Sequence, residues 1–114
     1  MDIEILRSIC LKQEGATEDI KWGNDLCFCI AEKMFCVAGL QPPLQISFKV
    51  KDDEFDELIN KQGIIPAPYV ARYKWVLAQD VNLFTKKQWE HYIRQSYELV
   101  KSKLSKKQLN KFNP

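Results

Sequence analysis

The segment of residues 44–51 constrains the fold more than any other part of the sequence, because apolar and polar residues alternate along it. Its apolar positions are Leu44, Ile46, Phe48 and Val50. A period of two places successive side chains on opposite faces of a β-strand. We therefore expect a strand with one face on a core and the other in water, as is typical of antiparallel sheets.

Other segments predict further strands. Residues 26–30 and 34–38 are rich in residues that favour strands, and residues 31–33 between them are short enough for a hairpin turn. Residues 72–79 predict a fourth strand, centred on Tyr73, Lys74, Trp75, Val76 and Leu77. Links of hairpin length indicate antiparallel pairing, because parallel strands need longer crossovers.

Two helices are expected in the first half of the chain. Residues 2–13 predict a helix, and residues 15–19 and 22–25 after it are polar and turn-rich. The apolar stripe of this helix is Ile5, Leu6, Ile9 and Cys10. A second, short helix is expected to be capped by Asp52 or Asp53 and to end at Gly63.

The C-terminal third predicts a long helix followed by a short one. Thr85 can cap the long helix, and Gln88 three residues later completes a capping box. The same pattern recurs at Ser105 and Gln108, so a terminal helix is expected to begin at Ser105.

The order of the elements predicts an α+β fold. A chain of 114 residues fits one domain, here residues 1–114, with helices mainly on one face of an antiparallel sheet. No apolar run approaches the ~20 residues that span a bilayer, so no membrane contact is expected. The acidic start lacks the features of a secretory signal, so we expect a cytoplasmic protein.

The spacing of the four cysteines predicts that they are free thiols. Cys10, Cys27, Cys29 and Cys36 form no paired C-x-x-C motif, and the single histidine, His91, is distant in sequence. Without an export signal, disulfides are not expected. A zinc site is disfavoured by the same spacing.

The motifs of common catalytic sites are absent from the sequence. It has no G-x-S-x-G and no phosphate-binding loop, and its four glycines lack a dinucleotide-binding spacing. His91 is expected to be a surface residue, and the acidic run of residues 52–57 is better explained by a helix N-terminus than by a metal site. We therefore expect no enzyme activity, no cofactor and no metal.

Charge is concentrated towards the C-terminus. Residues 86–114 hold eight basic and two acidic side chains, although the whole chain has a net charge of only +2. Such asymmetry can indicate an anionic partner, and it is also common on solvated helices.

Three aromatic residues could lie either in the core or at the surface, and the sequence pattern around each bears on which. Trp89 and Tyr97 share the apolar stripe of the long helix and are expected in the core. Trp75 is expected to share a strand face with Tyr73. On the covered face Trp75 is a core residue, and on the open face it becomes a recognition platform.

Several short motifs, in one order along the chain, resemble the MmcQ/YjbR family. They are Gly15-Ala16-Thr17-Glu18, Trp22-Gly23, Lys33-Met34-Phe35, Pro66-Ala67-Pro68-Tyr69, Lys74-Trp75-Val76, Ser96-Tyr97-Glu98-Leu99-Val100 and Lys103-Leu104-Ser105-Lys106-Lys107. The resemblance implies a CyaY-like, or frataxin-like, α+β domain, described for the family as a DNA-binding "double wing". It assigns no established chemical role to the matching Lys33, Phe35 and Trp75.

The frataxin-like arrangement also raises the question of a role in iron handling. That role needs a carboxylate-rich surface, because hard cations bind oxygen ligands. The first helix offers only Asp2, Glu4 and Glu14, interrupted by Arg7 and Lys12, so the sequence disfavours it.

Two function hypotheses follow. The first is a non-enzymatic module that binds nucleic acid, DNA in particular, by neutralising phosphates. Its expected contacts are Lys33, Lys49, Lys51, Arg72, Lys74, Trp75, Lys86, Lys87, Lys106 and Lys107. The second is a protein-interaction or regulatory domain that docks a protein partner on an open sheet face, without nucleic acid. The sequence leaves the oligomeric state open.

Overall fold

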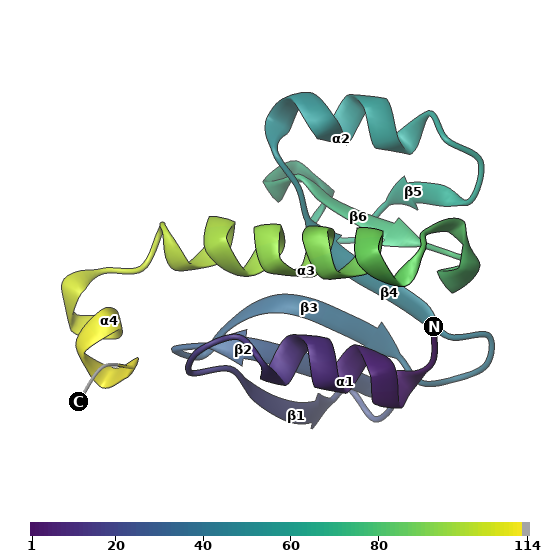
Figure 1. Ribbon diagram of the computed structural model, residues 1–114. Coiled ribbons are helices and arrows are strands. Elements are labelled where there is room, and N and C mark those ends of the chain that lie inside the picture. The colour runs from purple at the N-terminus through teal and green to yellow at the C-terminus, as the bar shows by residue number, and fades with distance from the viewer. Residues whose placement is uncertain (113–114) are drawn as a thin grey trace.

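The computed structural model describes residues 1–112 and contains helices on one side of a single sheet (Figure 1). The predicted domain, residues 1–114, extends two residues beyond the described part. Its strands are β1 (Thr17–Lys21), β2 (Asp25–Ile30), β3 (Lys33–Gly39), β4 (Gln45–Lys49), β5 (Ile64–Pro66) and β6 (Trp75–Ala78). Its helices are α1 (Ile3–Leu11), α2 (Asp52–Ile59), α3 (Lys86–Lys101) and α4 (Lys106–Phe112), with 3₁₀ turns η1 (Ala71–Tyr73) and η2 (Val81–Leu83).

The sheet is antiparallel throughout, in the order β1-β2-β3-β4-β6-β5. Helices α1 and α3 lie side by side across it, and α2 packs against β5 and β6 (Figure 1). The predicted α+β class and the placement of the helices mainly on one face are confirmed.

The alternation of residues 44–51 determines which face of the sheet is covered. Ile46 and Phe48 are fully buried, and their register partners on β6, Ala78 and Val76, are buried beside them. Trp89 and Tyr97 complete this core from α3, as predicted. Burial of such side chains is the main stabilising contribution to a fold of this size.

The predicted capping boxes are both present. Thr85 caps α3, with hydrogen bonds of 3.1 Å from the Gln88 backbone N–H and 2.8 Å back to the Gln88 side chain. Ser105 and Gln108 make the same pair of bonds at the start of α4. Satisfying the free N–H groups in this way fixes where each helix begins.

Helix α2 begins one or two residues earlier than predicted. Its N-cap is Lys51, not Asp52 or Asp53, and the Lys51 backbone N–H donates to the Glu54 side chain at 3.3 Å. Asp52 and Asp53 lie in the first turn, where negative charge complements the helix dipole.

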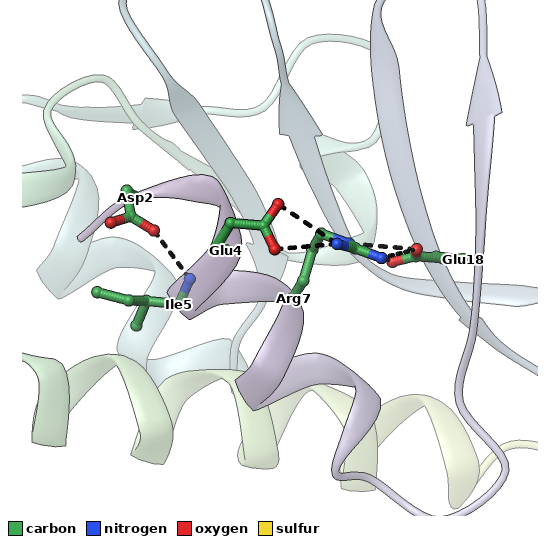
Figure 2. Close-up of polar contacts among 5 residues, drawn as sticks. All are labelled: Asp2, Glu4, Ile5, Arg7 and Glu18. Atoms are coloured by element: carbon green, nitrogen blue, oxygen red, sulfur yellow. Dashed lines mark hydrogen bonds and ion pairs between the residues drawn. The ribbon is translucent and has the colours of Figure 1, made fainter.

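The prediction of turns over residues 15–19 was wrong, because β1 occupies Thr17–Lys21. This edge strand is linked to α1 by Arg7, which donates to Glu18 at 2.6 Å and to Glu4 at 3.0 Å, as Figure 2 shows. Asp2 caps α1 by accepting from the Ile5 backbone N–H at 2.9 Å.

The predicted strand over residues 72–79 begins later than expected. Residues 71–73 form the 3₁₀ turn η1, and Lys74 adopts a left-handed backbone with a φ of 66°. The strand therefore starts at Trp75, and Tyr73 does not share a strand face with it.

The four cysteines are free, as predicted, and all four are buried. No helix among residues 1–112 is long and apolar enough to cross a membrane.

Candidate binding surface opposite the helices

The sheet face turned away from the helices carries a row of side chains fixed by register. Val37 pairs with Ser47, and Lys49 pairs with Trp75, so these residues alternate with the buried core positions. Residues 67–70 lie along part of this face, and the Ala67 backbone N–H donates to the backbone oxygen of Trp75 at 3.0 Å. This face is therefore partly covered rather than bare.

An apolar cavity of about 630 Å³ lies on this face. Its apolar lining includes Trp22, Met34, Val37, Pro68, Tyr69 and Trp75. Its polar groups are Asp25 and Ser47. The volume falls within the range of about 300–1,000 Å³ that is usual for small-ligand sites.

Two aromatic residues at this cavity are held in an unusual backbone conformation. Trp22 and Tyr69 have φ values of 53° and 69° and are 71% and 99% exposed. A left-handed conformation costs a bulky residue about 1–2 kcal/mol. Such strain is found most often at binding and active sites. Two large aromatic side chains are thus exposed to water at the edge of an apolar cavity.

A second, smaller pocket of about 370 Å³ adjoins the cavity, and three lysines contribute to a lining that is otherwise mainly apolar and includes Val100 and Leu104. Lys33, Lys49 and Lys103 come from three separate segments, and Tyr73 lies beside them. Met34, Val70 and Trp75 line both hollows, so the apolar cavity and this lysine pocket are neighbours.

Lys49 is the buried member of the lysine pocket. The residue is only 8% exposed, and its ammonium donates a hydrogen bond to the backbone oxygen of Tyr73. Burial, with the nearby positive charge of Lys103, holds the pKa of Lys49 below its usual value. A bound anion would relieve this concentration of positive charge.

The structure brings most of the predicted contact residues to one end of the sheet. Strand β3 starts where β4 ends and β6 starts, because neighbouring strands are antiparallel. The predicted residues in the segments that meet there are Lys33, Lys49, Lys51, Arg72, Lys74 and Trp75. Asp52, Asp53 and Glu54 begin α2 at the same end, so the charge there is mixed.

Two of these cations are directed at aromatic rings. The Arg72 guanidinium lies 4.8 Å from the ring centre of Tyr73, and the Lys74 ammonium lies 5.1 Å from that of Phe55. Neither Arg72 nor Lys74 lines the lysine pocket.

The remaining predicted contacts lie on other segments. Lys86 and Lys87 start α3, whose 16 residues place them about 24 Å from its other end. Lys106 and Lys107 start α4, a few residues beyond Lys103. The ten predicted residues therefore do not form one continuous site.

Trp75 is not an exposed stacking platform. The recognition-platform alternative required Trp75 to lie on the sheet face opposite the helices. It does lie on that face, but its side chain is only 6% exposed. Its indole forms a wall between the two hollows, together with Met34 and Val70. Neither alternative for Trp75 holds in full, because it lies on the open face but is buried there beside residues 67–70, which line the cavity with it.

Sequence reasoning missed Trp22 and Tyr69 as site residues. Both lie in turns, Trp22 before Gly23 and Tyr69 after Pro68, where large aromatic residues are uncommon. That mismatch was the signal available in the sequence.

The sequence analysis also weighed His91 and the acidic run of residues 52–57, and neither contributes to the two hollows. His91 is exposed on α3, and it lines neither the cavity nor the lysine pocket. Within residues 1–112, no three or more His, Cys, Asp or Glu side chains are grouped so that they could hold a metal ion.

Comparisons with known proteins agree on the fold. The family model YjbR matches residues 11–99. The crystal structure of the Deinococcus radiodurans protein DR2400, with a DUF419 domain, is similar at a TM-score of 0.83 and 23% identity, over 97% of this chain and 87% of that one. A Pseudomonas syringae protein is similar at a TM-score of 0.72 and 19% identity, over 87% of this chain and 98% of that one. No curated protein sequence matches the chain.

Proposed function

The chain belongs to the YjbR family, and on that premise we propose that it is a non-enzymatic, cytoplasmic module that binds nucleic acid, DNA in particular. The binding surface is centred on the lysine pocket of Lys33, Lys49 and Lys103. The family match supports the fold of this module, and the lysine pocket supports its chemistry.

The observation that carries the proposal is the buried ammonium of Lys49 among other lysines. Gathering positive charge in a partly desolvated pocket costs free energy, as the lowered pKa of Lys49 indicates. A phosphate group offsets this cost and accepts hydrogen bonds from several ammonium groups at once. Lys33 and Lys103 are exposed, so a phosphate can reach them without rearrangement of the fold.

Contacts of this kind fix the position of a nucleic acid but do not read its sequence. Affinity should therefore fall steeply with salt, because each neutralised phosphate releases counterions. The small net charge of +2 makes the expected number of contacts low.

The test is the affinity of a short DNA duplex, measured by fluorescence anisotropy across a salt series. The double variant Lys33→Gln/Lys103→Gln should bind more weakly and lower the salt slope by about 2, since each phosphate contact contributes about 0.9. The matched control is Lys86→Gln/Lys87→Gln, which removes the same charge at the other end of α3. Equal losses in both variants, or no salt-dependent binding of the wild type, would overturn the proposal.

The alternative, a protein-interaction domain, is favoured by one observation. Trp22 and Tyr69 are exposed aromatic residues beside an apolar cavity, and such groups are typical anchors for protein partners. A stoichiometric protein partner that resists nuclease treatment and is lost on Trp22→Asn, with no DNA binding by the wild type, would favour this alternative.

A further inference from the structure

We propose that the apolar cavity receives an unpaired nucleobase from the strand whose phosphate occupies the lysine pocket. This inference rests on the proposed function and specifies its ligand as single-stranded nucleic acid. It assigns the cavity, Trp22 and Tyr69 a role in binding the base.

The first argument is that the two hollows adjoin and differ in charge. Both linings are mainly apolar, but the smaller pocket also carries Lys33, Lys49 and Lys103, and Met34, Val70 and Trp75 line both hollows. In a nucleotide a flat apolar base and an anionic phosphate are joined by a single sugar. A ligand with these two parts matches an apolar cavity that adjoins a pocket carrying three cations.

The second argument is the aromatic lining. Bases of single strands bind aromatic side chains by stacking, whatever their sequence, because every base has a π face. Trp22 and Tyr69 are exposed and line the cavity, and Trp75 forms its inner wall. Trp22 and Tyr69 both adopt a left-handed backbone, and their rings are accessible to a ligand.

The third argument concerns strand pairing. A base inside a duplex is stacked on its neighbours and cannot enter a cavity unless it is flipped out, which costs free energy. A single strand avoids most of that cost. The cavity therefore favours single strands over duplexes, whereas the lysine pocket alone would bind both.

The polar groups of the cavity suggest which bases fit. The Asp25 carboxylate only accepts hydrogen bonds, so it favours a base that carries an amino group. Adenine, cytosine and guanine have such a group, whereas thymine presents oxygen acceptors beside its single N–H. Ser47 can donate or accept on the same sheet face.

The experiment compares oligodeoxyadenylate, oligodeoxycytidylate, oligothymidylate and a duplex of equal length, by fluorescence anisotropy. The variants are Trp22→Asn and Tyr69→Asn, because asparagine removes the ring yet tolerates a left-handed backbone. The control is Leu40→Ala, which removes an exposed apolar side chain that does not line the cavity.

We expect each aromatic variant to weaken single-strand binding by about tenfold, the loss typical of one stacking contact. Duplex binding and the Leu40→Ala variant should be unchanged. The adenine and cytosine oligomers should bind more tightly than the thymine oligomer, and Asp25→Asn should reduce that difference.

The failures of the two proposals are distinguishable. If single strands and duplex bind equally and neither responds to Trp22→Asn or Tyr69→Asn, while Lys33→Gln/Lys103→Gln weakens both, the cavity has no role and the proposed function stands. Binding of oligothymidylate as tight as that of the other oligomers would overturn the role of Asp25. If no oligonucleotide binds in a salt-dependent manner, both proposals fail.

Discussion

The hydroxyl of Ser96, in α3, accepts a hydrogen bond from the backbone N–H of Lys49 at 2.9 Å. The same hydroxyl donates to the backbone oxygen of Phe35 at 2.5 Å. Both contacts are buried and lie where the β3–β4 pairing ends, beyond the pair of Cys36 and Phe48. One side chain thus ties α3 to two strands and holds Lys49 at the lysine pocket.

Ser96→Ala should destabilise the protein, because it leaves a buried N–H and a buried carbonyl without that partner. Each unsatisfied group costs about 1–3 kcal/mol. Urea denaturation measures the loss. The control is Ser102→Ala, whose exposed hydroxyl donates to the backbone oxygen of Leu99, with an expected change within about 0.5 kcal/mol. An equally small effect of Ser96→Ala would show that the bridge does not contribute.

Glu32→Gly should stabilise the β2–β3 hairpin. Ala31 and Glu32 form its two-residue turn with φ values of 47° and 69°, a conformation that suits glycine. We expect a gain of about 1 kcal/mol in the free energy of unfolding. Glu57→Gly, on the exposed face of α2, makes the same chemical change and should cost about 1 kcal/mol. Destabilisation by both variants would contradict the assigned turn.

The cysteines should resist alkylation in the native protein. Burial raises the pKa of Cys10 and Cys29 above the usual value and that of Cys27 to about 11. Since the thiolate is the nucleophile, roughly one Cys27 thiol in a thousand is reactive at pH 8. Titration with a thiol reagent should detect all four cysteines only after unfolding in denaturant. Rapid modification of a native thiol would contradict their burial.

Glu18 should make stability depend on pH at the acidic end. Its hydrogen bond with Arg7 holds the pKa of the Glu18 carboxyl below its usual value. The folded state therefore holds this proton less tightly than the unfolded state, and the stabilisation is present above the unfolded pKa of about 4.3. It is lost as the pH falls through the lower folded pKa.

The measurement is the Tm of wild type and Glu18→Gln across this acidic range. The wild type should melt at a higher temperature near neutral pH, and the difference should vanish below the folded pKa of Glu18. A difference in Tm that does not change with pH would show that the Arg7 contact is not electrostatic.

The sequence predicted those elements whose signals are local. Alternation from Leu44 to Val50 predicted β4, and the capping pairs at Thr85 and Ser105 predicted the starts of α3 and α4. β1 was missed because its side chains are mostly exposed and it is held by backbone pairing and the Arg7–Glu18 contact. No apolar pattern marks a strand of that kind.

The site was harder to predict because it depends on contacts between distant segments. Lys33, Lys49 and Lys103 meet only once the strands are paired and α3 is placed. Burial of Trp75 depends on residues 67–70 lying along the sheet, and a left-handed Lys74 ends the 3₁₀ turn just before Trp75. Neither event leaves a periodic signal in the sequence.

The most direct test is the response of the three tryptophan indole N–H signals when NMR spectra are recorded during titration with oligodeoxyadenylate. Trp22 and Trp75 line the cavity, whereas Trp89 is fully buried and its indole N–H donates to Val81 at 2.8 Å. Binding of a base in the cavity predicts that the Trp22 and Trp75 signals shift with saturation while the Trp89 signal stays in place. Unchanged Trp22 and Trp75 signals at a concentration that saturates binding would contradict it.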